Sequence, residues 1–182
     1  MRSMLITNIP FTPAQLTFRD AWLYLFALAF AAGNLMLPMA VHTIPNGGLI
    51  FLPLFFFTLV AAYAEGLNTG LLVALASPLI NHALTGMPTG TMLPVILIKS
   101  LFIAVAAAYV ARHLSRISLP AIAGSVVAMQ ALGVIVEWVL SGNPAQATHA
   151  AILGIPGMIL MTLGGYALIR LIAALREKGI GR

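Results

Sequence analysis

Six long stretches of apolar residues, separated by short polar breaks, make up most of the chain. Most of them reach the roughly 20 residues that a helix needs to cross the hydrocarbon core of a bilayer. The breaks are rich in glycine, proline, asparagine and charged residues, which favour turns and end helices. This pattern predicts six transmembrane helices, at roughly 20–42, 48–64, 67–86, 91–113, 119–141 and 146–176.

The composition agrees with a membrane location. Of the 182 residues, 61% are hydrophobic and 7% are charged, whereas a soluble domain carries about 25% charged residues. The predicted connections are too short to hold a soluble domain. The expected fold is therefore an all-α integral membrane protein, a single six-helix transmembrane domain that spans residues 1–182.

Arginine and lysine lie on one side of this predicted bundle. The three loops at the opposite side contain neither residue. By the positive-inside rule, both termini are expected in the cytoplasm, and residues 42–48, 85–91 and 141–149 are expected to face outward. The distribution favours a multi-pass protein of a bacterial cytoplasmic (inner) membrane, and it gives no indication of a nucleic-acid partner. The basic residues that carry this prediction are Arg2, Arg19, Arg112, Arg116, Arg170, Arg176, Lys178 and Arg182.

Polar and soft side chains gather in the outward loops and the outer ends of the spans. Histidine and asparagine can hydrogen-bond a heterocycle, and histidine can also offer its imidazole to a haem or a corrinoid. Methionine can line an adaptable pocket. Taken alone, each histidine or methionine is more often structural than functional. Together they form the candidate small-molecule site: His42, Asn46, Asn81, His82, Met87 and His149.

Two ionisable residues, Lys99 and Glu137, lie inside the fourth and fifth predicted spans. A charged residue at the bilayer centre costs at least about 2.5–3.5 kcal/mol on insertion scales, so both are expected to face the protein interior. One interpretation is a salt bridge that ties the two spans together. The other is that one or both bind a charged group of a solute.

Sequence signatures of catalysis are missing. The chain has no cysteine, no paired histidines with zinc-protease spacing, no nucleophile elbow and no Gly-rich phosphate loop. We therefore do not expect an enzyme, a cofactor or a dedicated metal site. The alternative is a small intramembrane enzyme or an assembly factor that uses the outward histidines and Lys99. A channel or exporter is disfavoured because the cytoplasmic half of the spans looks apolar and rich in alanine.

In the first span, Ala27 and Ala31 lie one helical turn apart. Small residues at this spacing let another helix approach closely. Packing within the chain and docking of a partner subunit are both compatible with this strip.

These features resemble the substrate-binding S-components of energy-coupling-factor (ECF) vitamin transporters, along the whole chain. The resemblance is carried by the six spans, by the alanine motif at Ala27 and Ala31, and by three segments: NGGLIFLP at 46–53, ASPLIN at 76–81 and GMP at 86–88. Two subgroups are not matched. Nickel and cobalt members begin with Met-His, where this chain has Met1-Arg2. Certain cobalamin-binding relatives use a cysteine ligand, which this chain lacks, and a replacement by His82 would be speculative.

The resemblance implies a mechanism. An S-component captures a vitamin or related micronutrient in its outer half, beneath the loop between the first two spans. It then topples in the membrane when a transmembrane coupling subunit and two ATPase subunits engage it. The strip of Ala27 and Ala31 would contact the coupling subunit, so Ala27→Trp is expected to abolish uptake and spare binding.

Overall fold

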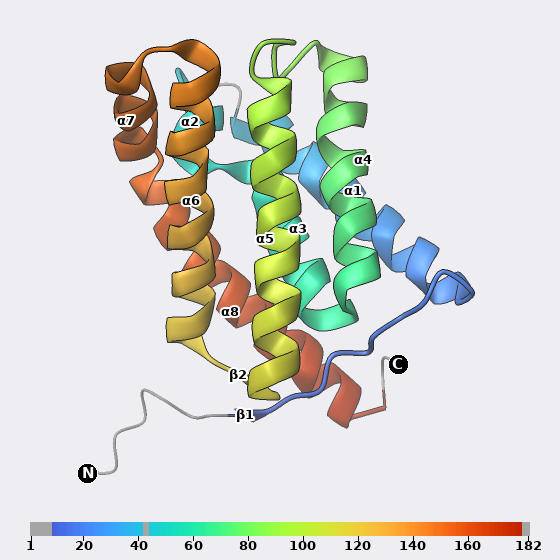
Figure 1. Cartoon of the computed structure of the whole chain (residues 1–182). Coiled ribbons are helices and arrows are strands. Elements are labelled where there is room, and N and C mark those ends of the chain that lie inside the picture. Colours follow the sequence, from blue (N-terminus) through green and yellow to red (C-terminus); the bar gives the residue numbers. More distant parts are fainter. Residues whose placement is uncertain (1–8, 42–43, 180–182) are drawn as a thin grey trace.

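The computed structural model describes residues 9–41 and 44–179, and it is built almost entirely of helices (Figure 1). His42, one of the predicted site residues, lies outside the described residues. The elements are, in chain order, β1 (Ile9–Pro10), α1 (Ala21–Val41), α2 (Gly47–Phe51), α3 (Pro53–Glu65), α4 (Leu67–Thr85), α5 (Leu93–Leu114), β2 (Arg116–Ile117), α6 (Leu119–Ser141), α7 (Pro144–Leu153) and α8 (Ile155–Glu177).

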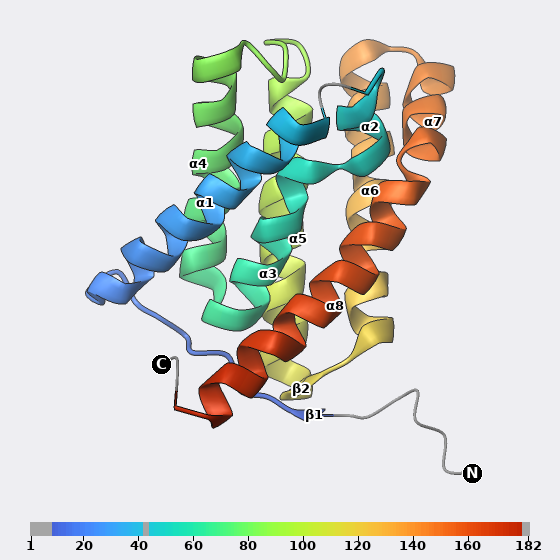
Figure 2. The same cartoon turned by 180° about the vertical axis from the view of Figure 1, so that it is seen from behind.

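Six segments are long and apolar enough to cross a membrane, as the sequence predicted, with α2 and α3 together forming the second. Two of the predicted continuous spans are broken, however. The second breaks at Leu52, which has a φ of 50°, because the proline at position 53 disfavours a helical conformation for the residue before it. The sixth breaks at Gly154 into the short helix α7 and the spanning helix α8. Both breaks lie at the same end of the bundle (Figure 2).

The helices surround α3. In Figure 1, α4, α5 and α6 stand side by side, and Figure 2 shows α1 and α8 crossing the bundle obliquely on either side of α3. The end that carries α2, α7 and the loops 86–92 and 142–143 is called the loop end. The opposite end carries β1, β2 and the last turn of α8, and is called the β end.

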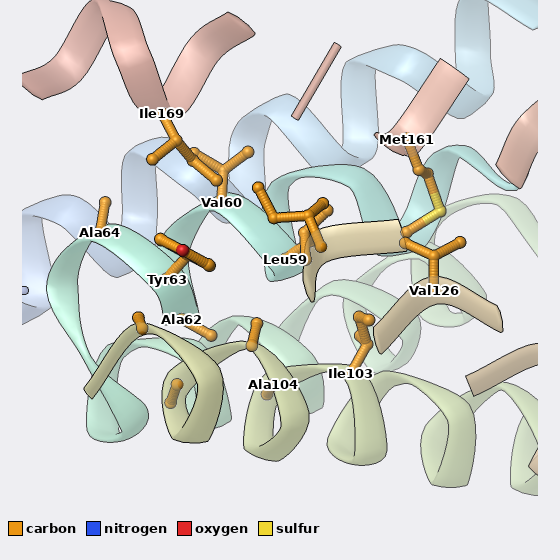
Figure 3. Packing of buried hydrophobic residues seen from close by; sticks show 14 of the residues in the cluster. Leu59, Val60, Ala62, Tyr63, Ala64, Ile103, Ala104, Val126, Met161 and Ile169 are labelled. Atoms are coloured by element: carbon orange, nitrogen blue, oxygen red, sulfur yellow. The ribbon is translucent and has the colours of Figure 1, made fainter. Parts of the chain in front are cut away.

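The core is packed where α3 faces α5, α6 and α8. Leu59, Val60 and Tyr63 of α3 are fully buried, and Figure 3 shows them among side chains from the surrounding helices. Small residues bring α3 and α4 together: a Cβ on Gly70 would lie 2.5 Å from the Cβ of Ala62. The partners of α3 in this core are Ile103, Ala104, Val126, Met161 and Ile169.

The alanine strip of α1 takes part in this internal packing. Ala27 and Ala31 are 8% and 5% exposed, and Ala27 clusters with Ala61 of α3 and Val73 of α4. Ala27 therefore packs within the chain, and docking of a partner subunit on the strip stays a prediction. The strip lets α1 approach α3 and α4, which is the internal role that the sequence left open.

An ion pair secures the β end. Arg176 of α8 donates to the Glu65 carboxylate at 2.5 Å and to the Ala64 carbonyl at 3.2 Å, and its guanidinium lies 5.8 Å from the centroid of the Phe11 ring. Phe11 follows β1, which pairs with β2 in an antiparallel arrangement. The N-terminal segment is therefore tied to the α5–α6 connection and to α8.

Candidate functional site

A cavity of about 420 Å³ lies at the loop end. This volume is within the range of small-molecule sites, which are about 300–1,000 Å³. Its apolar wall includes Leu52, Phe55, Val95, Ile96 and Val134. Polar side chains from five parts of the chain face the same space: Asn46, Asn81, Thr89, Lys99, Gln130 and Glu137.

Helical spacing places the polar residues of α6 on one face. Gln130, Gly133 and Glu137 follow each other at intervals of three and four residues, which puts them in a row along the helix. All three line the cavity. Lys99 enters from α5, six residues after that helix begins at Leu93, or about 9 Å from its start at 1.5 Å per residue.

The Lys99 side chain is buried, with 9% of its surface exposed. Its Nζ donates a hydrogen bond to Gln130 Oε1 at 2.8 Å and lies 5.2 Å from the centroid of the Phe55 ring. Gly133 makes room for this side chain, because a Cβ there would lie 2.7 Å from Lys99 Cδ and 3.1 Å from Nζ. The ammonium group is therefore held at a defined position in the cavity wall.

Lys99 and Glu137 do not form a salt bridge. Both line the cavity, yet within residues 9–41 and 44–179 the one ion pair is between Arg176 and Glu65. The sequence left open a structural pair or a ligand-binding role for these residues. Among the described residues, no carboxylate lies within ion-pair distance of the Lys99 ammonium, although Glu137 lines the same cavity, so a solute carboxylate could approach the ammonium directly.

The Asn81 side chain is also buried and faces the cavity, with 2% of its surface exposed. Its backbone carbonyl accepts a hydrogen bond from Thr85 Oγ1 at 2.7 Å. Its side-chain amide has no hydrogen-bond partner in the described part of the chain. Buried amides are normally paired, so this one has donors and an acceptor free for a ligand.

Gln130 connects Lys99 to the covering elements of the cavity. Its Nε2 donates to the Ala151 carbonyl of α7 at 3.4 Å. A Cβ on Gly154, at the α7–α8 junction, would lie 2.9 Å from the same Nε2 and 3.4 Å from the Leu49 carbonyl of α2. The cover made by α2 and α7 is thus packed directly on the residue that binds Lys99.

Neither Gln130 nor Gly133 was identified from the sequence. A signal was present, since Gln130 is a polar residue in the middle of a hydrophobic span and must find a partner there. The partner was not evident, because the sequence does not specify which face of α6 meets α5. The same holds for α7, which the sequence merged with the last span.

Two of the predicted histidines, His82 and His149, do not line the cavity. His82 lies outside its wall, with Nδ1 2.7 Å from the Pro88 carbonyl, and so fastens the loop 86–92 to α4. His149 is exposed on α7 and does not line the cavity. No group of three metal-ligating side chains occurs among residues 9–41 and 44–179. The expectation of a shared histidine site is therefore not met by His82 and His149, whereas Asn46 and Met87 do line the cavity as expected.

No protein-family model matches the chain, and comparisons with curated proteins and with solved structures gave no match either. The functional argument consequently depends on the cavity and on the sequence.

Proposed function

We propose that this protein is the substrate-binding S-component of an ECF-type importer, and that it captures a vitamin or related micronutrient in the cavity at the loop end. A transmembrane coupling subunit and two ATPase subunits would supply the energy. The observation that carries the proposal is the cavity itself, in which the buried polar groups of Lys99 and Asn81 are left without full partners.

The distribution of charge supports outward capture. Arg112, Arg116, Arg176 and Lys178 lie at or beside the β end (Figure 1), and the loops at the loop end contain no arginine or lysine. We propose on this basis that both termini are cytoplasmic and that the cavity faces the outside of a bacterial cytoplasmic membrane.

The core below the cavity favours binding over conduction. Leu59, Ile103, Val126 and Met161 are fully buried between the helices on the way to the β end. A channel needs a wetted path, and the burial of these apolar side chains in the described part of the chain supports a carrier over a channel. A carrier that moves as a body through the membrane does not need such a path.

The size of the cavity fits a micronutrient. A volume of about 420 Å³ lies toward the lower end of the range of small-molecule sites, about 300–1,000 Å³. This volume suits a compact organic molecule.

Uptake into cells tests the proposal. The chain is expressed with the coupling subunit and ATPases of its host organism, and uptake of the compound that co-purifies with it is measured. We expect uptake that requires ATP hydrolysis by the partner subunits and that is lost without this chain. Uptake that continues without the ATPases, or a chain that does not associate with the coupling subunit, would contradict the proposal.

The orientation can be tested separately, because the chain contains no cysteine. Thr89→Cys places a single thiol at the loop end, and Lys178→Cys places one at the β end. In intact spheroplasts, a membrane-impermeant maleimide is expected to label the first variant only. Labelling of the second variant alone would reverse the orientation.

A further inference from the structure

We infer that the occupant of the cavity is a compact organic acid with a single negative charge, whose carboxylate binds Lys99. This inference rests on the proposed function, since it specifies the substrate class for the same cavity. Three observations carry it. Lys99 is a buried cation, no carboxylate of the described residues lies within ion-pair distance of it, and the Glu137 carboxylate lies elsewhere in the same cavity wall.

The first step concerns the charge of Lys99. An ammonium group has three donors, and the one hydrogen bond that Lys99 makes in the described chain goes to the neutral oxygen of Gln130. An unpaired charge in a low-dielectric site is unfavourable, and a paired one much less so. A carboxylate in the cavity would accept from the remaining donors and neutralise the charge.

The second step limits the number of negative charges. Glu137 lies one helical turn beyond Gly133 on α6, about 6 Å along the axis at 1.5 Å per residue. The described wall therefore holds one cationic and one anionic group. A phosphate ester or a dicarboxylate would bring a second negative charge without a second cation to meet it. Among anions, a monocarboxylate can pair with Lys99 and adds the least negative charge to a wall that already holds the Glu137 carboxylate.

The third step concerns the rest of the solute. Most of the wall between these polar groups is apolar, from Leu52, Phe55, Val95 and Val134. Asn81 adds an unpaired amide on the α4 side. These contacts suit a branched or cyclic hydrocarbon body with at least one amide, ureido or hydroxyl group, and they do not suit a fully polar molecule such as a free sugar.

The test uses acids and their uncharged counterparts on the detergent-purified full chain. The probes are pantothenate with panthenol, biotin with biotin methyl ester, and nicotinate with nicotinamide, and binding is measured by isothermal titration calorimetry after removal of any co-purified compound. We expect an acid from this panel, or the co-purified compound, to bind at least tenfold more tightly than its uncharged counterpart.

Two variants with opposite charge effects make the assignment specific. Lys99→Met should weaken binding of the acid by roughly tenfold to hundredfold, as expected for losing a hydrogen bond between charged groups, and should leave the uncharged counterpart unaffected. Glu137→Gln should strengthen binding of the acid by about two- to tenfold, because it removes a like charge at moderate distance. Melting temperatures of both variants show whether each one folds. Lys99→Gln is a second variant in case Lys99→Met does not fold.

Several results would overturn the inference. They are tighter binding of an uncharged or cationic compound, no binding of any acid, or equal binding of the acid by wild type and folded Lys99 variants. Uptake of an uncharged compound would refute this substrate class and leave the transport proposal standing. Lys99-dependent binding of an acid without ATPase-dependent uptake would support this substrate class and refute the transport proposal.

Discussion

Gly133 determines how Lys99 sits in the cavity, and Gly133→Ala therefore gives a precise test of the site. The added Cβ would lie 2.7 Å from Lys99 Cδ, 2.8 Å from Cε and 3.1 Å from Nζ, whereas carbon atoms in contact prefer about 3.5–4.0 Å. The end of the lysine must therefore move by roughly 1 Å. The lysine can move because it is a flexible side chain, so the variant should fold.

Such a shift would break or bend the hydrogen bond from Lys99 Nζ to Gln130 Oε1, now 2.8 Å long, and would displace the ammonium from its ligand. Hydrogen bonds to charged groups contribute about 1.5–3 kcal/mol, which corresponds to a loss of affinity of roughly tenfold to hundredfold. Replacing a helical glycine by alanine favours the helix by about 0.5–1 kcal/mol. The melting temperature of the unliganded variant should therefore change little.

The control is Gly124→Ala in the same helix, where a Cβ would meet nothing within 4 Å. Binding is measured by titration calorimetry with the compound that wild type retains, and stability by thermal unfolding in the same detergent. The control should bind as wild type does. If Gly133→Ala also binds like wild type, Lys99 does not contact the ligand from the position that its side chain has in the structure.

Three further predictions concern stability and the cover of the cavity. Arg176→Met leaves the buried Glu65 carboxylate without its partner and should destabilise the fold by about 3–5 kcal/mol. The melting temperature should fall, and adding Glu65→Gln should partly restore it. An unchanged melting temperature would show that the ion pair is dispensable. Gly157→Ala puts a Cβ 2.6 Å from the backbone of α2. Because α2 must then shift, ligand release, measured by dissociation kinetics, should be faster than in wild type. A wild-type rate would mean that α2 does not cover the ligand. Ala27→Trp places an indole where the alanine is only 8% exposed, so it should lower both the melting temperature and uptake. Gly124→Ala is the reference variant. Loss of uptake at wild-type stability would favour a docking role for this position.

Hydropathy alone could predict the six spans, because a segment that crosses a bilayer must be apolar over its whole length. It could not locate the breaks at Leu52 and Gly154. Each break is accompanied by a proline, Pro53 directly after the first and Pro156 two residues after the second, but neither proline was interpreted as the end of a separate helix. These two breaks create α2 and α7, which cover the cavity.

The site could be predicted in part. Lys99 and Glu137 were recognisable because ionisable residues inside a span must face protein or water, and Asn46, Asn81 and Met87 line the cavity as expected. Two of the predicted histidines lie elsewhere: His82 contacts the Pro88 carbonyl of the loop 86–92, and His149 is exposed on α7. Proximity to the same membrane surface does not specify which side of its helix a residue occupies.

The hydrogen-bond partner of Lys99 could not be predicted from the sequence. Glu137, the partner that the sequence suggested, and Gln130, the partner in the structure, lie on one face of α6 two turns apart. The rotation of α6 and the missing side chain at Gly133 bring Gln130 to the lysine and leave Glu137 out of ion-pair range. Helix rotation and close approach are properties of helix packing, and they could not be predicted from a single sequence.

The most direct measurement is the quantity and identity of small molecules released when the detergent-purified protein is denatured, determined by mass spectrometry for wild type and Lys99→Met in parallel. The account predicts a stoichiometric amount of a compact carboxylic acid from wild type and a much smaller amount from the variant. Wild-type protein that neither yields such a compound nor binds an added one, or equal yields from both proteins, would contradict the account.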